Sequence, residues 1–303
     1  NSILIAEGVI NDLHCDAVKE IIELNELETK DIDVIGFHGQ TLLHNPDEGW
    51  SWQIGDGREL ADRVGIKVVN DFRRFDVENG GQGAPLVPIF HHALLPENEA
   101  DFPIALLNIG GVANMTWFDG RDPNDMVAFD TGPGNALLDD WVRSHSDMPY
   151  DKDGAMSSKG NVQEILVNEL MNHEYFKEMP PKSLDRDAFD VSSISMLSPE
   201  DGAATIIAFT VNAIKMAEVM CPEFVKKWYV CGGGAHNPAM MKMLSDELFG
   251  EVKNIAELGF DGDFVEAEAF AYLAVRKLYN LPITFPGTTG VKKPSTGGVI
   301  YNP

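Results

Sequence analysis

Two stretches of the sequence, IALLNIGG at residues 104–111 and MVAFDTGPGN at residues 126–135, decide the fold class. Each is a short apolar run, typical of a buried strand, that stops at glycine. A third run of this kind, WYVCGGGAH, occupies residues 228–236. Helical patterns follow or separate these strands, at residues 136–143, 198–220, 238–249 and 266–279. This alternation predicts a layered α/β protein.

The chain before residue 104 repeats the alternation. Strands are expected at residues 33–38, 51–55 and 66–70, and helices at residues 16–25, 58–64 and 85–95. A polar stretch at residues 96–101 predicts a boundary between two lobes. Residues 147–195 show little periodicity and are expected to be rich in loops.

The composition fits a folded protein and excludes several classes of function. The 303 residues are 44% hydrophobic, which is enough for a large core and excludes wholesale disorder. With 23 basic and 48 acidic residues, the chain has a net charge of −25. This charge repels phosphate backbones and anionic membranes, so nucleic-acid binding is strongly disfavoured.

Cysteine usage and the first residues predict a soluble, cytoplasmic protein. Cys15, Cys221 and Cys231 form no CxxC pair, which excludes a disulfide scaffold or a zinc ribbon and favours reduced thiols. Residues 1–15 lack the basic start and apolar run of a signal peptide, and no run approaches 18 apolar residues. The sequence begins without Met, which suggests a truncated or partial chain.

The three glycine-rich strand ends are the clearest indication of a ligand site. Glycine lets a ligand phosphate approach the backbone closely and lets successive N–H groups point at one anion. Helices are expected soon after Gly134 and Gly234, and their N-termini would add positive partial charge. Each end alone could be only a tight turn, but three in one chain favour a phosphate site. None matches the P-loop or the spaced dinucleotide fingerprint.

Asp130 is the single residue that most directly suggests catalysis. It is expected to end an apolar strand and to open the turn at residues 132–134, which would direct its carboxylate into a cleft beside the phosphate-binding loops. A carboxylate there suits a general base or a magnesium ligand. The alternative, a helix-capping Asp, is weaker because Asp130 lies too far before the helix expected at Ala136.

A second group of polar residues follows two strands in the first part of the chain. His38 and Gln40 follow one strand, and Asp71, Arg73 and Asp76 follow another. Ligands of open sheets bind beside such strand ends, and this mixture suits a sugar with hydroxyl and carboxylate groups, which Arg can hold through two hydrogen bonds. The alternative is a surface network of salt bridges around the two adjacent arginines.

An ordered set of motifs resembles one protein family. The motifs are GFHGQT at residues 36–41, QIGD at 53–56, DFRRFD at 71–76, GGQGAPLVP at 80–88, NIGGVAN at 108–114, FDTGPGN at 129–135, CGGGAHNP at 231–238 and EAEAFA at 266–271. Any one of them is weak, but the set in this order is highly specific. The sequence resembles the anhydro-N-acetylmuramic acid kinases, members of the sugar kinase, actin and heat-shock chaperone superfamily.

The resemblance implies a two-lobed, actin-like ATPase fold of the α/β class with a central cleft. The sugar-side lobe would comprise residues 1–102, completed by residues 284–303, and the nucleotide-side lobe residues 103–283. With ATP and Mg²⁺ as cofactors, water would open the 1,6-anhydro bridge at C1, and the freed O6 would take the γ-phosphoryl group. The product would be N-acetylmuramic acid 6-phosphate, an intermediate of peptidoglycan recycling.

The resemblance also implies roles for individual residues. Asp130 would be the base that activates water and could also bind Mg²⁺, and Glu266 would be a further residue of the cleft. The substrate-binding residues implied are His38, Gln40, Asp71, Arg73, Asp76 and Asn108. The nucleotide-binding residues implied are Gly110, Gly111, Asn114, Thr131, Gly132, Gly134, Gly232, Gly233, Gly234 and Asn237.

One part of the family pattern has no counterpart here. The family opens with a β-hairpin of the type Met-Ser-Gly-Thr-Ser-x-Asp-Gly that cradles the ATP phosphates, whereas the residues before His38 are typical of a connecting helix. The first lobe is therefore expected to be incomplete at its N-terminus. The alternative function is a non-catalytic or differently specific ATP-lobe protein of the same superfamily. The expected partners are small molecules; the chain could also form a homodimer.

Overall fold

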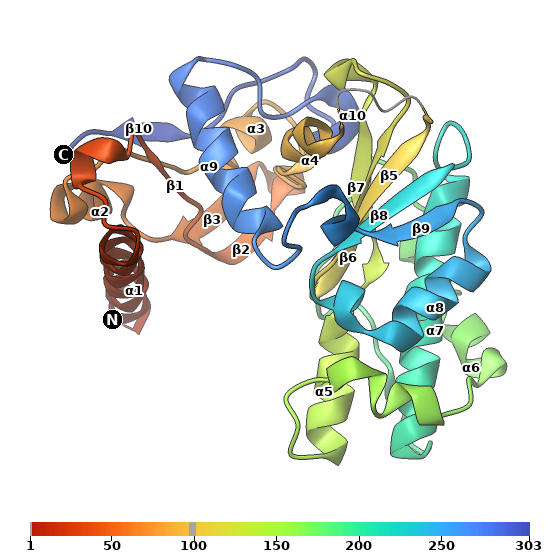
Figure 1. The fold of residues 1–303 in the computed structure, drawn as a ribbon. Helices are drawn as coiled ribbons and strands as arrows, with labels where there is room; N and C mark the ends of the chain where they lie inside the picture. Colours follow the sequence, from red (N-terminus) through yellow and green to blue (C-terminus); the bar gives the residue numbers. More distant parts are fainter. Residues whose placement is uncertain (1, 97–100) are drawn as a thin grey trace. The chain divides into compact units, whose positions relative to one another are not determined.

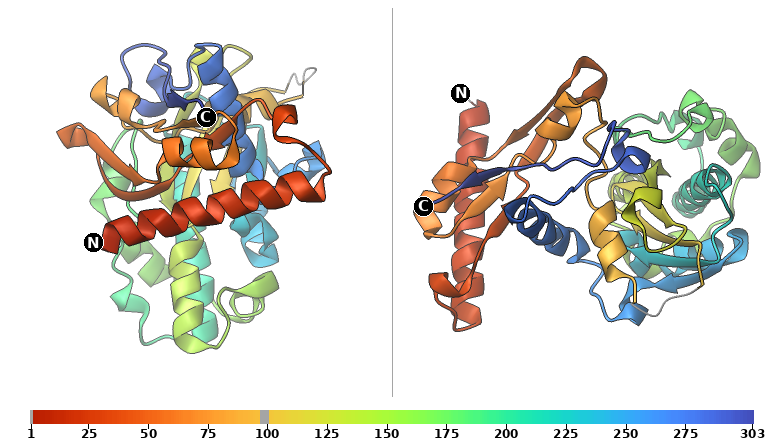
Figure 2. Two further views of the ribbon diagram at one scale, coloured as in Figure 1. Left: turned by 90° about the vertical axis from the view of Figure 1, so that its left-hand side faces the viewer. Right: turned by 90° about the horizontal axis from the view of Figure 1, so that it is seen from above.

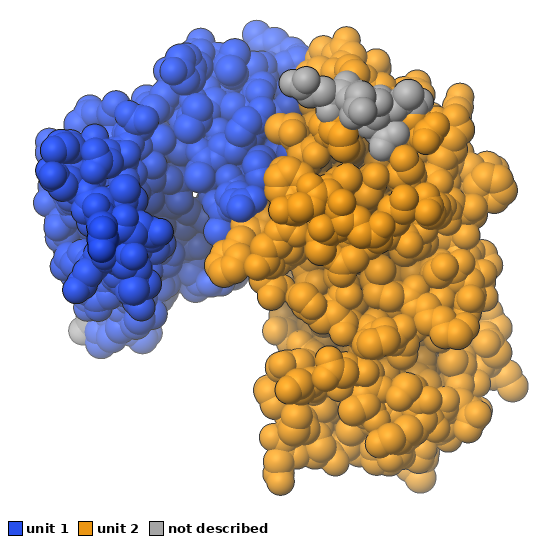
Figure 3. All heavy atoms as spheres, in the orientation of Figure 1, with its two compact units in different colours: residues 1–90, 266–303 blue, residues 91–265 orange. Residues whose placement is uncertain are grey.

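The computed structural model of the chain describes residues 2–96 and 101–303. It is a mixed α/β structure, as the sequence predicts (Figure 1). The chain divides into two compact units, described separately below: unit 1 is Asn1–Phe90 with Glu266–Pro303, and unit 2 is His91–Val265 (Figure 3). The boundary expected at residues 96–101 includes residues 97–100, which lie outside the described residues. The lobe limits, the central cleft and the incomplete first lobe stay predictions.

Unit 1 contains a small sheet and a separate hairpin. The sheet has the order β1 (Ile35–Phe37), β4 (Val68–Asn70), β10 (Val299–Tyr301), with β1 parallel and β10 antiparallel to β4. The antiparallel hairpin consists of β2 (Gln40–Asn45) and β3 (Trp50–Ile54). The final segment of the chain therefore completes a sheet that begins near residue 35.

The helices of unit 1 include one, the second along the chain, that packs on this sheet and on the first helix. They are α1 (Ser2–Leu24), α2 (Gly57–Val64), α3 (Arg74–Glu78), α4 (Pro88–Leu94), which continues into unit 2, α9 (Val265–Leu278) and α10 (Pro286–Thr289). The carboxylate of Asp56 accepts hydrogen bonds from the first N–H groups of α2, which fixes where that helix begins. Helix α9 lies so close to β1 that a Cβ atom on Gly36 would be 2.0 Å from the Phe270 carbonyl oxygen.

Unit 2 is built on one five-stranded sheet. Its order is β7 (Val127–Pro133), β6 (Val112–Phe118), β5 (Ile104–Ile109), β8 (Lys227–Cys231), β9 (Glu251–Asn254). Strand β6 is antiparallel to both β5 and β7, whereas β8 is parallel to β5 and to β9. The carboxyl ends of β5, β7 and β8 consequently lie at the same edge of the sheet.

Helix α7 (Pro199–Val219) is the core helix of unit 2 and contacts β7, α5 (Asn135–His145), α6 (Glu164–Leu170) and α8 (Pro238–Glu247). It begins where predicted, with the Ser198 hydroxyl accepting a hydrogen bond from the Asp201 N–H. By length and composition α7 could cross a membrane, but 78% of its most apolar window is buried inside the structure, which is typical of a core helix.

Several predicted boundaries were wrong. Helix α1 begins at Ser2 rather than near residue 16 (red in Figures 1 and 2), and the helix expected from Pro85 begins at Pro88. The strand expected at residues 126–129 continues to Pro133, because Gly132 and Pro133 pair with β6 beyond a bulge. Asp130 therefore lies inside β7 and not at its end.

Candidate functional site

The three glycine-rich turns meet at one edge of the sheet in unit 2. A Cβ atom on Gly134 would lie 2.2 Å from the Gly110 carbonyl oxygen, and one on Gly232 would lie 2.3 Å from Oδ1 of Asn108. Both distances are far below an ordinary van der Waals contact. At these contacts only glycine allows the three turns to pack together.

The first N–H groups of α5 hold two of these turns together. The Asn135 N–H donates to the Gly110 carbonyl at 2.7 Å, and the N–H groups of Gly134 and Ala136 donate to the Gly111 carbonyl at 3.0 and 3.2 Å. At the third turn, Oδ1 of Asn237 caps the N-terminus of α8. These N–H groups already have partners within the protein, and the contribution of the helix N-termini to an anion site stays a prediction.

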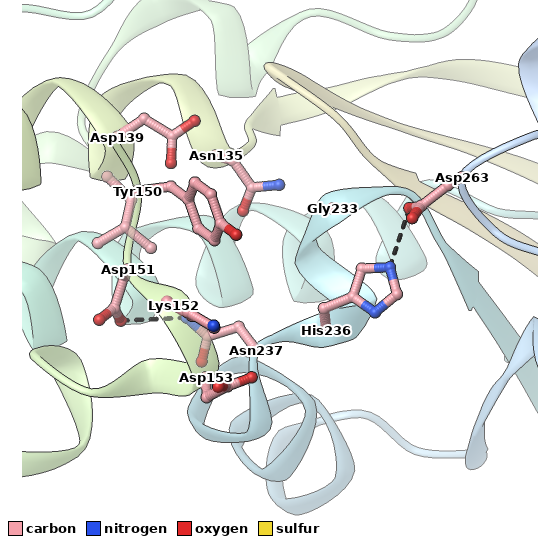
Figure 4. A pocket seen from close by; sticks show the side chains of 11 residues that line it. Asn135, Asp139, Tyr150, Asp151, Lys152, Asp153, Gly233, His236, Asn237 and Asp263 are labelled. Carbon is pink, nitrogen blue, oxygen red and sulfur yellow. Dashed lines mark hydrogen bonds and ion pairs between the residues drawn. The ribbon is translucent and has the colours of Figure 1, made fainter. Parts of the chain in front are cut away.

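A cavity of about 530 Å³ lies beside these turns, a size usual for a ligand pocket (Figure 4). Residues from α5, from the segment before α6 and from the turn after β8 surround it. They include Asn135, Tyr150, Asp153, Gly233, His236 and Asn237. The structure thus brings Gly233 and Asn237, both predicted to bind nucleotide, to the wall of one cavity.

Carboxylates dominate the polar lining of this cavity. Asp151 is buried; its carboxylate accepts hydrogen bonds from the Ser157 hydroxyl at 2.5 Å and from Nδ2 of Asn237 at 3.2 Å, so it orders the wall. Asp263 pairs with His236 at 2.9 Å (Figure 4). Burial raises the pKa of Asp139. These carboxylates suit the hydroxyl and amino groups of a ligand, and the lining also includes one lysine, Lys152.

Asp130 is not one of the residues that line this cavity. It is 9% exposed, and its cross-strand partner on β6 is Asn114. Oδ2 of Asp130 accepts a hydrogen bond from the Leu184 N–H at 2.8 Å. The neighbouring Thr131 hydroxyl donates to the Ala113 carbonyl. Oδ1 of Asn114 is buried and has no hydrogen-bond partner among the described residues. A ligand donor or a water molecule would satisfy it.

Unit 1 contains a second cavity, of about 390 Å³, with a strongly polar lining. His38, Asp71 and Arg74 line it, together with Asn70 and Gln53. The imidazole Nδ1–H of His38 donates to the Gly39 carbonyl at 2.8 Å. Burial and the nearby Arg73 charge lower the His38 pKa to about 4, so the ring is neutral at physiological pH.

The two adjacent arginines have different surroundings. Arg73 donates from Nε to Nε2 of His38 at 3.0 Å and from Nη1 to the Gly83 carbonyl at 2.7 Å, which ties the histidine to the 80–83 loop. Arg74 lines the cavity and forms an ion pair with Asp71. Arg74, rather than the predicted Arg73, is therefore the arginine at the cavity wall.

Three further predicted site residues line neither of these cavities. Asp76 is buried, and its carboxylate accepts hydrogen bonds from the Gly83 N–H at 2.7 Å and the Thr289 hydroxyl at 2.8 Å. Gln40 lies exposed on β2, and Glu266 is exposed in the first turn of α9. Their binding roles stay predictions.

Sequence reasoning missed several residues that line the cavities. Gln53 had a signal, because it opens the QIGD motif, whereas Asn70 belongs to the polar group already noted at the end of its strand. His236 lies in the CGGGAHNP motif but was not selected. Tyr150 comes from the weakly patterned stretch after residue 147, and its sequence context gave no signal.

These features define a mixed α/β protein with a glycine-rich sheet edge, the class in which ligands bind beside strand ends. Comparison with known proteins narrows the class. The family model for anhydro-N-acetylmuramic acid kinase matches residues 4–303. A protein of that name from Zymomonas mobilis subsp. mobilis is 50% identical over 296 residues, 98% of this chain and 80% of that protein. One from Methylobacterium nodulans is 50% identical over 298 residues, 98% of this chain and 79% of that protein.

The chain belongs to the anhydro-N-acetylmuramic acid kinase family. Among solved structures, the activator of the 2-hydroxyisocaproyl-CoA dehydratase from Clostridium difficile with bound ADPNP matches 74% of this chain and 72% of that chain. Its sequence identity is 12% and its TM-score 0.42, a similarity too low to support an argument.

Proposed function

We propose that this chain is an ATP-dependent kinase that opens 1,6-anhydro-N-acetylmuramic acid with water and phosphorylates the freed O6. Family membership over residues 4–303 is the observation that carries this proposal. The two cavities supply the local chemistry that it needs, one for a nucleotide and one for a sugar acid. The product is N-acetylmuramic acid 6-phosphate, which places the reaction in peptidoglycan recycling.

The cavity of unit 2 is the proposed nucleotide site. Its volume of about 530 Å³ suits a nucleoside, and its aspartates offer acceptors for ribose hydroxyls and base amino groups. Gly233 and Asn135 form the side of the cavity at the glycine-rich edge of the sheet. We assign the phosphates to that side, because glycine backbone there permits the closest approach. The other glycine positions predicted to bind nucleotide are part of the same proposal.

The polar cavity of unit 1 is the proposed sugar site. Arg74 offers a guanidinium for the lactyl carboxylate, and Asp71 holds that guanidinium in place. Oδ1 of Asn70 is buried without a hydrogen-bond partner among the described residues, so it can accept a hydrogen bond from a sugar hydroxyl. His38 is neutral and lines the same cavity.

Asp130 is the proposed general base. As the water oxygen bonds to C1, its proton passes to the Asp130 carboxylate, and the C1–O6 bond breaks with its electron pair going to O6. O6 then takes the γ-phosphoryl group, and ADP leaves. Positioned general bases contribute typically about 10²–10⁴-fold to the rate. The hydrogen bond from Leu184 already orients the carboxylate.

Mg²⁺ belongs to the proposal as a companion of ATP. No group of three or more His, Cys, Asp or Glu side chains within residues 2–96 and 101–303 could hold a metal ion. This fits the usual behaviour of Mg²⁺, which retains water and binds nucleotide phosphates with one or two carboxylates. Asp130, the magnesium ligand that the resemblance implies, is the base in this proposal, so Mg²⁺ would be held by the ATP phosphates and water. Bound there, the ion would neutralise charge on the transferred phosphoryl group.

A cytoplasmic location is also part of the proposal. Cys15, Cys221 and Cys231 are not in disulfides, which agrees with a reducing compartment. The substrate and ATP are both small molecules, and the proposal requires no macromolecular partner.

The test is to incubate the protein with ATP, Mg²⁺ and 1,6-anhydro-N-acetylmuramic acid and to analyse the products by mass spectrometry. We expect N-acetylmuramic acid 6-phosphate and ADP in equal amounts. ATP binding without any sugar phosphate would favour the alternative, a non-catalytic or differently specific ATP-lobe protein. A phosphorylated sugar that retains the anhydro bridge would contradict the hydrolytic step.

A further inference from the structure

The segment from Tyr175 to Leu184 forms hydrogen bonds to both the backbone and the side chain of Asp130. The Asp130 N–H donates to the Lys182 carbonyl at 3.1 Å, and the Asp130 carbonyl accepts the Tyr175 hydroxyl at 2.5 Å. The Leu184 N–H donates to Oδ2 of the carboxylate. Backbone and side chain of Asp130 are thus fixed by one segment, although β6 already pairs with this part of β7.

The side chain of Lys182 bonds back to the start of this segment. It is 5% exposed, its Nζ donates to the Tyr175 carbonyl at 2.9 Å, and the ammonium lies 4.2 Å from the centroid of the Tyr175 ring. Burial lowers the Lys182 pKa to about 8, and the Glu178 and Asp130 carboxylates act in the opposite direction. A buried ammonium is costly, and an apolar side chain would fill the same space at lower cost. Packing alone therefore gives no reason for a lysine here.

We propose that Lys182 and Tyr175 are positioning residues, which hold the Asp130 carboxylate in the orientation that proton transfer requires. The inference rests on the proposed function, in which Asp130 is the base. Anchoring Oδ2 at Leu184 sets the direction of the other carboxylate oxygen, and Lys182 and Tyr175 keep the anchoring segment in place. Small displacements of a reacting group can lower rates by about 10²-fold, so this support affects kcat directly.

A merely structural role for these residues predicts a different result. Tyr175 packs in a cluster with Phe176, Phe189 and Phe209, and loss of that packing would lower stability alone. The informative variants are therefore Lys182→Met, which keeps the bulk of the side chain, and Tyr175→Phe, which keeps the ring and removes the hydroxyl. Lys177→Met is the matched control, because Lys177 belongs to the same segment but is exposed and forms an ion pair with Glu174 at the surface.

The experiment measures kcat, both KM values and the melting temperature of each variant with ATP, Mg²⁺ and the anhydro sugar. We expect Lys182→Met to lower kcat about 10- to 100-fold with both KM values within about twofold. Tyr175→Phe should lower kcat by a smaller factor, and Lys177→Met should leave it unchanged. If Lys182→Met does not fold, the kcat of Tyr175→Phe alone tests the inference. A normal kcat in the folded variants, at whatever melting temperature, would overturn the inference.

A double-mutant comparison separates this inference from the proposed function. If Lys182 acts through Asp130, Asp130→Asn with Lys182→Met has the same residual kcat as Asp130→Asn alone. A further independent loss in the double variant would mean that Lys182 acts elsewhere. An inactive Asp130→Asn beside a fully active Lys182→Met contradicts only the inference. A fully active Asp130→Asn contradicts the base assignment and the inference together.

Discussion

Substitution of Gly134 by alanine tests whether the glycine-rich turns are packed together as described. The new Cβ atom would lie 2.2 Å from the Gly110 carbonyl oxygen and 3.0 Å from that of Gly111. An ordinary contact needs about 3.5 Å, so the backbone must move by about 1 Å. That movement strains the turn, at about 1–3 kcal/mol, and weakens the 2.7 Å bond from the Asn135 N–H, worth about 1 kcal/mol. We expect the free energy of unfolding to fall by roughly 2–4 kcal/mol.

Gly120→Ala is the control for this substitution. Gly120 lies in the turn between β6 and β7; no atom lies within 4 Å of a Cβ atom added there, and its φ is outside the left-handed region. Alanine there should leave stability unchanged or raise it by up to about 1 kcal/mol, because it restricts the unfolded chain. Urea unfolding followed by tryptophan fluorescence measures both variants, and calorimetry measures their ATP affinity. Equal stability and equal ATP affinity in the two variants would refute the packed arrangement of the turns.

Three further predictions concern the sugar cavity, pH and the wall of the nucleotide cavity. Arg74→Ala should weaken binding of the anhydro sugar about 10- to 100-fold in calorimetry, and binding of an analogue without the lactyl carboxylate should stay nearly unchanged. Equal losses of affinity for both ligands would show that Arg74 does not bind the carboxylate. Burial lowers the pKa of His91 to about 4, below its unfolded value of about 6.5, so its contribution to stability is complete above pH 6.5 and is lost as the pH falls towards 4. Urea unfolding at pH 7.5 and pH 5 should differ by roughly 2 kcal/mol from this residue, and a His91→Gln variant that keeps the whole difference would contradict this. Asn237→Ala should lower stability by about 1–2 kcal/mol through loss of the α8 cap and should also weaken ATP binding; a stability loss alone would limit Asn237 to capping.

The fold class could be predicted because the decisive strands are local features. Residues 104–109 are apolar and stop at a glycine pair, and the structure places a strand there with the predicted bounds. The extent of β7 could not be predicted in this way. Its last residues pair with β6 only beyond a bulge. This bulge is a tertiary feature that cannot be recognised in the sequence TGP. Asp130 was therefore expected at a strand end.

The residues of the candidate site could likewise be predicted only in part, because tertiary contacts decide which side chains line a cavity. The DFRR motif identified the correct segment, but adjacent side chains point in different directions, and only the structure shows that Arg74 lines the cavity while Arg73 holds His38. The support around Asp130 comes from Tyr175, Lys182 and Leu184, more than 40 residues away in a stretch of weak pattern. Such long-range hydrogen bonds leave no periodic signal in a sequence.

The most direct test of the account is the kcat of Asp130→Asn, measured beside its melting curve and its affinity for the anhydro sugar. Asparagine is nearly isosteric and retains an oxygen that can accept the Leu184 N–H, so the fold and sugar binding should persist. It cannot take the proton of the attacking water, so kcat should fall by at least about 10²-fold at unchanged melting temperature. A variant with near-normal kcat, whatever its stability, would show that another group activates the water.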